Sequence, residues 1–237
     1  MSQAPHVIRG IRGEAVRFGA QMKIEDSLFG GLLDPYCNLF MAQTSDRVAA
    51  KYGITRQAQD EYALRSHVEG VRAVKAGLFK EEIVAVPVKR KGETVGYASD
   101  DHIKPDTSLE KLAQLPASFG KDGTVTAGNA SGIVDGAACV VVTTSSRAKE
   151  DGLRPLGRVV GWSAVGVPPD IMGIGPAMAI RDLLKRIGME LGNVDLFEIN
   201  EAFSGQYLAV EKDLGNDRAK TNVNGGSIGL GHPLGAT

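Results

Sequence analysis

One histidine near the end of the sequence stands in a glycine-rich run, Asn222-Val223-Asn224-Gly225-Gly226-Ser227-Ile228-Gly229-Leu230-Gly231-His232-Pro233-Leu234-Gly235. Glycine lets the backbone approach a ligand closely, and proline fixes the local turn. An imidazole in such a loop exchanges protons near neutral pH. His232 is therefore the first candidate for a group that takes part in proton transfer.

The same run matches neither of the common phosphate-binding motifs. Gly226 and Gly231 have the spacing of a P-loop, but His232 occupies the position that requires lysine. The dinucleotide fingerprint also fails, because Leu234 stands where a third glycine is required. A tight turn whose histidine merely caps a neighbouring element stays open on this segment alone.

A second polar pair, Asn200 and Glu201, follows the apolar run 194–199, which we expect to be a strand. Helically spaced apolar residues come next, at Phe203, Tyr207, Val210 and Leu214, and Gly215 is typical of a helix end. The pair then lies at a strand-to-helix junction, where open α/β sheets place ligands. Asn200 could instead be a helix N-cap. Glu201 could either favour the helix N-terminus or support hydrogen bonds of a site.

Residues 124–132 form a third segment, a loop of small residues that carries the hydroxyl of Ser131. Between the three segments, periodicity predicts alternating elements. We expect a short helix near residues 24–33 and two helices over 45–76, the first capped by Ser45 or Thr44 and ended by Gly53, and the second capped by Thr55. The apolar face of the second helix is expected to consist of Leu64, Val68, Val71 and Val74. Further helices are expected over 108–115 and 176–187, the latter ended by Gly188, and strands over 83–88, 139–142 and 156–162. This alternation indicates an α/β protein.

The three segments together resemble the thiolase family. TAGNASG at 126–132, NEAF at 200–203 and NVNGGSIGLGHPLGA at 222–236 occur in the family's order, and the resemblance extends over almost the whole sequence. It is strongest to the 3-ketoacyl-CoA thiolases of the mitochondrial type. It implies thiolytic cleavage of 3-ketoacyl-CoA to acetyl-CoA and a shortened acyl-CoA in fatty-acid β-oxidation, with coenzyme A as substrate and no bound cofactor or metal.

The resemblance also implies the thiolase fold, two similar αβ halves in a layered αβαβα arrangement with an inserted lid. On that fold, residues 1–133 are mostly lid and loop domain of the N-terminal half, 134–154 its closing strand region, and 155–237 the start of the C-terminal half. We therefore expect a segment that lacks both ends of a thiolase. A naturally short paralogue is the alternative.

Catalytic roles follow from the resemblance residue by residue. His232 is matched to the histidine that polarises the substrate carbonyl, and Asn200 to the asparagine that holds a water in the oxyanion site. Ser131 is matched to a position that contacts coenzyme A; its alternative is a turn hydroxyl bonded to its own backbone.

The remaining candidates for coenzyme A and substrate binding lie in the expected lid and in the motifs: Lys104, Thr107, Met41, Phe119, Ala127, Ala202 and Phe203. Lys104 stands where the family often has arginine, so it keeps a cation without the bidentate fork. Phe40 replaces a histidine found in some relatives, which indicates a different acyl-chain preference. Ordinary core packing is an equal alternative for Met41 and Phe119.

The two cysteines do not match the family's catalytic cysteines. Cys37 lies in the lid, and Cys139 lies in an apolar run that we expect to be a buried strand with an inert thiol. The nucleophilic and acid–base cysteines of the family would fall outside residues 1–237. We therefore expect these residues alone to be inactive.

Composition limits the partners and leaves several alternatives. A formal net charge of −1 and no basic block argue against nucleic acid, and no apolar run approaches the ~18 residues of a membrane span. The resemblance implies acyl-CoA and CoA as ligands, a dimeric or tetrameric parent with residues 9–29 joining dimers, and the mitochondrial matrix, with the cytoplasm as alternative. An acetoacetyl-CoA thiolase or a non-catalytic acyl-CoA-binding paralogue are the competing functions.

Overall fold

The computed structural model describes residues 1–9, 19 and 22–236. Most of the proposed dimer-joining stretch, 9–29, therefore falls outside the described residues at positions 10–18, 20 and 21. The helices are α1 (Ser27–Gly31), α2 (Met41–Tyr52), α3 (Arg56–Lys75), α4 (Leu109–Ala113), α5 (Ser145–Glu150), α6 (Gly175–Ile187), α7 (Ser204–Leu214) and α8 (Ser227–Leu230), with 3-10 turns η1 (Pro169–Ile174), η2 (Leu191–Asn193) and η3 (Arg218–Lys220).

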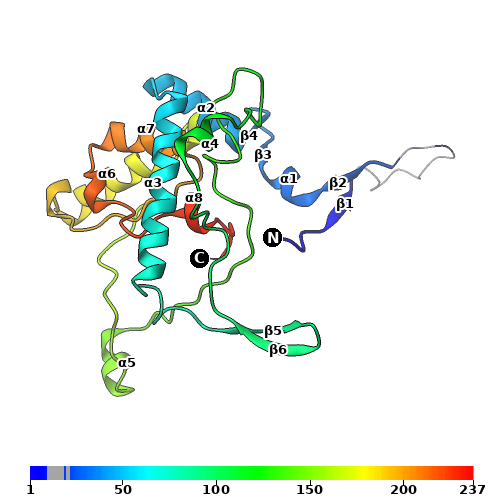
Figure 1. Cartoon of the computed structure of the whole chain (residues 1–237). Helices are drawn as coiled ribbons and strands as arrows, with labels where there is room; N and C mark the ends of the chain where they lie inside the picture. Colours follow the sequence, from blue (N-terminus) through cyan, green and yellow to red (C-terminus); the bar gives the residue numbers. More distant parts are fainter. Residues whose placement is uncertain (10–18, 20–21, 237) are drawn as a thin grey trace.

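The strands of the described residues form three antiparallel pairs. They are β1 (His6–Ile8) with β2 (Ile24–Asp26), β3 (Leu33–Asp34) with β4 (Leu39–Phe40), and β5 (Val86–Arg90) with β6 (Glu93–Tyr97). The β1–β2 pair and the β5–β6 hairpin project away from the helices, as Figure 1 shows.

Helix α7 is the centre of the helical body. Residues 204–210 are all buried, and Tyr207, Ala209 and Val210 are 0% exposed. Helices α2, α3 and α6 pack against α7 (Figure 1). The residues of these first two turns are mostly small or apolar, whereas the charged residues Glu211, Lys212 and Asp213 lie in the more exposed last turn. The loops at its N-terminal end are thereby held on a rigid support.

Helix boundaries follow the predicted signals where a glycine or a capping hydroxyl is present. Gly53, Gly188 and Gly215 end α2, α6 and α7 in the left-handed conformation, with φ of 65°, 66° and 77°. The Thr55 hydroxyl accepts from Ala58 N at 3.1 Å and caps α3.

The predicted cap of α2 was wrong. This helix begins at Met41, four residues before the expected start. The Thr44 hydroxyl is inside the helix and donates to Met41 O at 2.7 Å instead of capping. The expected helix near residues 24–33 is also shorter, because residues 24–26 pair with β1.

The buried face of α3 differs from the predicted apolar one. Val68 and Val74 are 54% and 45% exposed, whereas Ser66 and Ala73 are 0% exposed. This face packs on the glycine-rich segment, where a Cβ on Gly225 would lie 2.7 Å from the backbone of Gly70. Close approach of two backbones requires small side chains, so the hydrophobic pattern does not identify this face.

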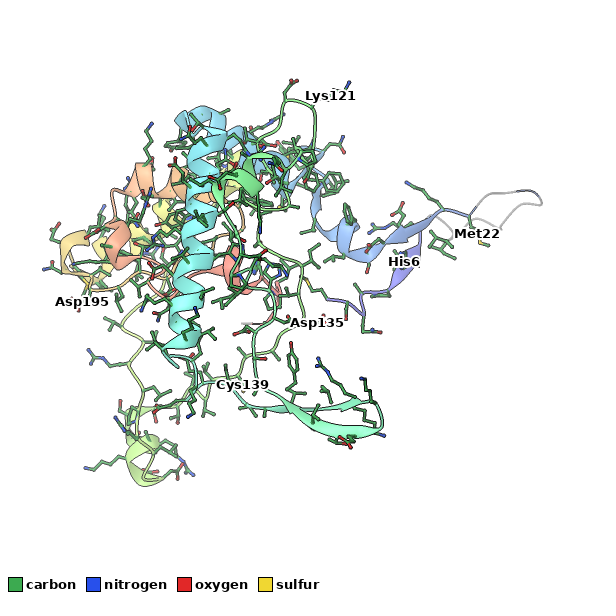
Figure 2. The ribbon with its side chains drawn as sticks, in the orientation of Figure 1. His6, Met22, Lys121, Asp135, Cys139 and Asp195 are labelled. Carbon is green, nitrogen blue, oxygen red and sulfur yellow. The ribbon has the colours of Figure 1, made fainter. Side chains whose placement is uncertain are left out.

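Three predicted strands are absent from the described residues. The runs 139–142 and 156–162 form no strand, Cys139 is exposed, and Val141 is 85% exposed. Figure 2 labels Cys139 on this extended segment, outside the packed helices. The prediction of a buried strand at 139–142 is thus wrong for the described residues, which supply no neighbouring strands to pair with it. The assignment of residues 134–154 to a closing region of the N-terminal half stays a prediction. Residues 194–199 make only a parallel bridge, from Phe197 to Thr221.

Candidate active site

The segments that carry His232 and Asn200 meet at the N-terminal end of α7. Asn200 Nδ2 lies 3.3 Å from His232 Nε2, although the residues are 32 apart in sequence. The His232 backbone is fixed separately, because its N–H donates to Gly132 O at 2.9 Å. The glycine-rich segment is therefore hydrogen-bonded to both of the other motifs, at Asn200 and at Gly132 of the loop 124–132.

The orientation of the Asn200 amide follows from its second neighbour. Ser227 Oγ accepts from Glu201 N at 2.9 Å and donates to Asn200 Oδ1 at 2.7 Å. The amide nitrogen must then face the imidazole and donate to it. With Nε2 accepting, the neutral ring carries its proton on Nδ1. The amide has a second N–H, which gives the site a donor for a substrate oxygen or a water.

Burial lowers the pKa of His232 below its ordinary value of 6.5. The imidazole is therefore neutral at physiological pH. A neutral ring can hold one proton and accept another, as acid–base work on a carbonyl compound requires.

Asn200 is not the cap of the helix that follows it. Helix α7 begins at Ser204, and its N-cap position is Phe203, with no side-chain cap bond. The Glu201 side chain supports hydrogen bonds and does not act at the helix end. It is 0% exposed, and its carboxylate accepts from Tyr62 Oη at 2.7 Å and from Asn222 Nδ2 at 3.0 Å.

The loop 124–132 is held by two side chains that the sequence does not single out for this task. Asp46 Oδ1 of α2 accepts from Thr124 N at 2.8 Å and from Val125 N at 3.1 Å. Asn129 Nδ2 donates to Asp60 Oδ1 of α3 at 2.9 Å. These bonds position Ser131, whose hydroxyl donates to Ala202 O at 3.0 Å and not to its own turn.

A cavity of about 570 Å³ opens beside the Asn200–His232 pair. Its lining is mostly apolar, with a few polar groups, as is usual for sites that bind organic ligands. Eight of the ten candidate residues contribute to the lining: His232, Asn200, Ser131, Met41, Phe119, Ala127, Ala202 and Phe203. Their chemical roles stay predictions, but the structure places them together around one space.

Lys104 and Thr107 lie apart from this cavity, in a turn in which Thr107 N donates to Lys104 O at 3.2 Å. Lys104 N in turn donates to His67 Nδ1 at 3.2 Å, which ties the turn to α3. Contact of these two residues with a nucleotide stays a prediction.

Three aromatic rings form a wall of the cavity that sequence reasoning found only in part. The Phe40 ring centroid lies 5.9 Å from that of Phe29 and 5.8 Å from that of Phe119. Phe29, in a short helix with no motif around it, gave no signal. Ser227 was visible in the glycine-rich run, but only the folded distance shows that it orients Asn200.

Neither cysteine belongs to the cavity lining among the described residues. Cys37 lies in the β3–β4 turn, where partial burial and the Asp34 carboxylate raise the pKa of its thiol. A thiol with a raised pKa is a poor source of thiolate. No group of three His, Cys, Asp or Glu side chains in the described part of the chain is placed to hold a metal ion. None of the described helices is long and apolar enough to cross a membrane.

The three motifs and their place in the fold are those of one protein family. The model of the thiolase N-terminal domain matches residues 1–146, and that of the thiolase C-terminal domain matches residues 153–237. The chain belongs to the thiolase family and has the thiolase α/β fold.

The chain is also similar to individual members of this family and to their solved structures. The chain is 47% identical to human mitochondrial 3-ketoacyl-CoA thiolase over 237 residues, which are 100% of this chain and 59% of the relative. The crystal structure of the Bacillus anthracis acetyl-CoA acetyltransferase matches with a TM-score of 0.93 at 46% identity, over 98% of this chain and 59% of that one. Human mitochondrial 3-ketoacyl-CoA thiolase in complex with CoA matches with a TM-score of 0.90 at 44% identity, over 99% and 58%. The chain thus spans about 59% of the length of these relatives.

Proposed function

We propose that the protein containing this chain is an acetyl-CoA C-acyltransferase, a thiolase that cleaves 3-ketoacyl-CoA with CoA and can run the reverse condensation. The observation that carries the proposal is the Asn200–His232 pair, 3.3 Å apart at the edge of an apolar cavity that Ser131 also lines. The human relative that was solved with CoA supports a CoA thioester as the ligand.

The chemistry requires an attacking thiolate and stabilisation of a carbonyl oxygen. The thiolate adds to the C3 carbonyl, the C2–C3 bond breaks, and its electron pair leaves on C2 as the enolate of acetyl-CoA, which takes up a proton. The acyl group then passes from the enzyme sulfur to CoA. Donors aimed at an oxygen that gains negative charge lower such barriers strongly.

Within this scheme, residues 1–237 supply the polar groups around the carbonyl. His232 polarises the oxygen, and Asn200 donates to it or to a water beside it. Because neither cysteine lines the cavity in the described residues, the proposal assigns the thiolate to sequence outside residues 1–237. A protein that only bound acyl-CoA would have no need for the oriented amide and imidazole.

The acyl preference separates two thiolase activities. The wall of Phe29, Phe40 and Phe119 supports medium or long 3-ketoacyl chains, whereas an acetoacetyl-CoA thiolase needs room only for a two-carbon acyl group. A Phe40→His variant should lower kcat/KM for 3-ketodecanoyl-CoA more than for acetoacetyl-CoA. An unchanged ratio would favour the acetoacetyl-CoA activity.

The direct test uses the native protein. It is captured from its source with an antibody against residues 1–237, its intact mass is measured, and CoA-dependent loss of 3-ketoacyl-CoA is assayed. A mass well above 25.0 kDa with thiolysis supports the proposal, whereas a mass near 25.0 kDa without thiolysis indicates a binding or assembly protein.

Location and assembly belong to the same proposal. The relatives named mitochondrial support the mitochondrial matrix, and the similar bacterial enzymes keep a cytoplasmic location as the alternative. We also propose a dimer or tetramer. Organelle fractionation and the native mass of the captured protein test both statements.

A further inference from the structure

The carboxylate of Glu201 is buried at 0% exposure and accepts four hydrogen bonds. Tyr62 Oη at 2.7 Å and Asn222 Nδ2 at 3.0 Å donate to Oε1. Ser66 Oγ at 2.6 Å and Ile228 N at 3.2 Å donate to Oε2. Two of the four donors, Tyr62 and Ser66, come from α3, more than a hundred residues away in sequence.

The direction of these bonds is fixed by the other partners of each hydroxyl. Ser66 Oγ accepts from Gly226 N at 3.1 Å and from Gly229 N at 3.0 Å, so its own proton must point to Glu201. Tyr62 Oη accepts from Asn222 Nδ2 at 3.2 Å, which directs its proton to the same carboxylate. Each oxygen of this buried carboxylate therefore has two hydrogen-bond donors.

The network reaches the Asn200–His232 pair by two short routes. Gly226 and Gly229, whose N–H groups donate to Ser66 Oγ, lie one residue before and two residues after Ser227. The Ser227 hydroxyl in turn donates to Asn200 Oδ1 at 2.7 Å and orients this amide. Glu201 is also the chain neighbour of Asn200. The Glu201 carboxylate packs tightly against the backbone of Gly226, because a Cβ on Gly226 would lie 2.2 Å from the carboxyl carbon of Glu201.

We propose that Ser66 and Tyr62 are positioning residues of the thiolase reaction, which hold the Asn200–His232 pair through Glu201 and the amides of the glycine-rich segment. The inference rests on the proposed function. In the described part of the chain neither side chain lines the cavity, so their loss should alter the geometry of the carbonyl site without altering ligand contacts.

The test compares Ser66→Ala and Tyr62→Phe with two matched controls in the protein expressed from its complete gene. Ser204→Ala removes another 0% exposed serine hydroxyl, and Tyr207→Phe removes the hydroxyl of the ring stacked on Tyr62 at 4.2 Å. Among the described residues, neither control hydroxyl is one of the hydrogen-bond donors to Glu201. The network variants should lower kcat about ten- to a hundredfold with KM for CoA changed less than about twofold, while the controls retain kcat.

A second readout does not need turnover. Diethylpyrocarbonate modifies neutral imidazole, so the pH dependence of His232 modification, followed by peptide mass spectrometry, reports the accessibility and pKa of this ring. Ser66→Ala should speed the modification of His232, and Ser204→Ala should not. Glu201→Gln keeps the shape of the side chain but replaces one acceptor oxygen with an N–H₂ group, which faces hydrogen-bond donors. This variant should also speed the modification of His232.

The two readouts separate the failure of the proposed function from failure of the inference. If the native protein shows no thiolysis but the reactivity of His232 still depends on Ser66, the proposed function is overturned and the positioning role of Ser66 stands. Equal kcat and equal His232 reactivity in Ser66→Ala and Ser204→Ala overturn the positioning role. An increase in KM for CoA with unchanged kcat would also overturn it, because it would show a binding role.

Discussion

Ser227 fixes the direction of the Asn200 amide: its hydroxyl lies 2.7 Å from Oδ1, which turns Nδ2 toward His232 at 3.3 Å. A hydroxyl that accepts from one backbone N–H and donates to one amide oxygen leaves the amide a single orientation. The site is therefore preorganised before any ligand enters it. Preorganised donors cost no rearrangement at the moment of reaction.

Removal of this hydroxyl should weaken catalysis without weakening binding. Ser227→Ala lets the Asn200 amide rotate, and we expect kcat for thiolysis to fall about tenfold, the equivalent of one oriented hydrogen bond. Steady-state kinetics of the protein expressed from its complete gene measure this, with Ser204→Ala as the control. A kcat equal to that of the control would show that Ser227 does not orient the amide.

A negative charge introduced at position 200 should shift the pH dependence of kcat. Burial places the pKa of His232 below 6.5, so activity that needs the neutral ring is lost only as the pH falls below that value. Asn200→Asp puts a carboxylate beside Nε2 and should raise the pKa of His232, which moves the acidic limb of kcat to higher pH. It should also lower kcat about a hundredfold through loss of a donor. An acidic limb that moves to lower pH would contradict this.

Residues 1–237 expressed alone should show no thiolase turnover. Cys37 and Cys139 lie outside the cavity lining of the described residues, so no thiolate faces His232. The absorbance of the acetoacetyl-CoA enolate, followed with free CoA, measures the rate. Turnover at ordinary rates that disappears in Cys37→Ser or Cys139→Ser would contradict the assignment of the nucleophile.

Stability should fall with acid because of His67. This side chain is 6% exposed, and burial, with His102 and Lys104 nearby, lowers its pKa to about 4. The unfolded chain binds the proton below pH 6.5 and the folded chain only below about pH 4, so stability is full above 6.5 and is lost between the two values. The loss is on the order of 3 kcal/mol.

His67→Asn keeps an acceptor for Lys104 N without titrating, and should flatten this dependence. Denaturant unfolding at pH 7 and pH 5 measures the effect, with His6→Asn at an exposed position as control. Equal slopes for His67→Asn and the unaltered protein would show that another group is responsible.

The exposed apolar runs should make residues 1–237 self-associate. Val140, Val141 and Val142 are 81%, 85% and 79% exposed, and Trp162 is 74% exposed. Unpaired extended segments with such side chains pair readily with other chains. Gel filtration should show species above 25.0 kDa, and Val141→Lys should reduce them more than Val68→Lys on α3. A sharp 25.0 kDa peak with cooperative melting would contradict this.

The part of the fold that sequence predicts is the part governed by local signals. Gly53, Gly188 and Gly215 end their helices, and Tyr207 and Val210 mark the buried helix α7. Runs such as 139–142 have strand-forming side chains, but a strand also needs partners, and the sequence does not say which residues supply them.

The candidate site also contains some residues that the sequence predicts and others that only the structure identifies. His232, Asn200 and Ser131 stand in motifs and could be named from the sequence, and the structure places all three at one cavity. Ser66 and Tyr62 could not be named, because nothing near them in the sequence distinguishes them from other residues of a helix. Their contacts with Glu201 cross 135 and 139 residues of chain and exist only after folding.

The most direct measurement replaces the matched segment of human mitochondrial 3-ketoacyl-CoA thiolase with residues 1–237 and assays thiolysis of 3-ketoacyl-CoA. If this chain supplies the carbonyl-polarising groups of a thiolase site, the chimera should turn over, and His232→Ala should lower its kcat by about a hundredfold or more. A folded chimera whose turnover does not depend on His232 would contradict the account.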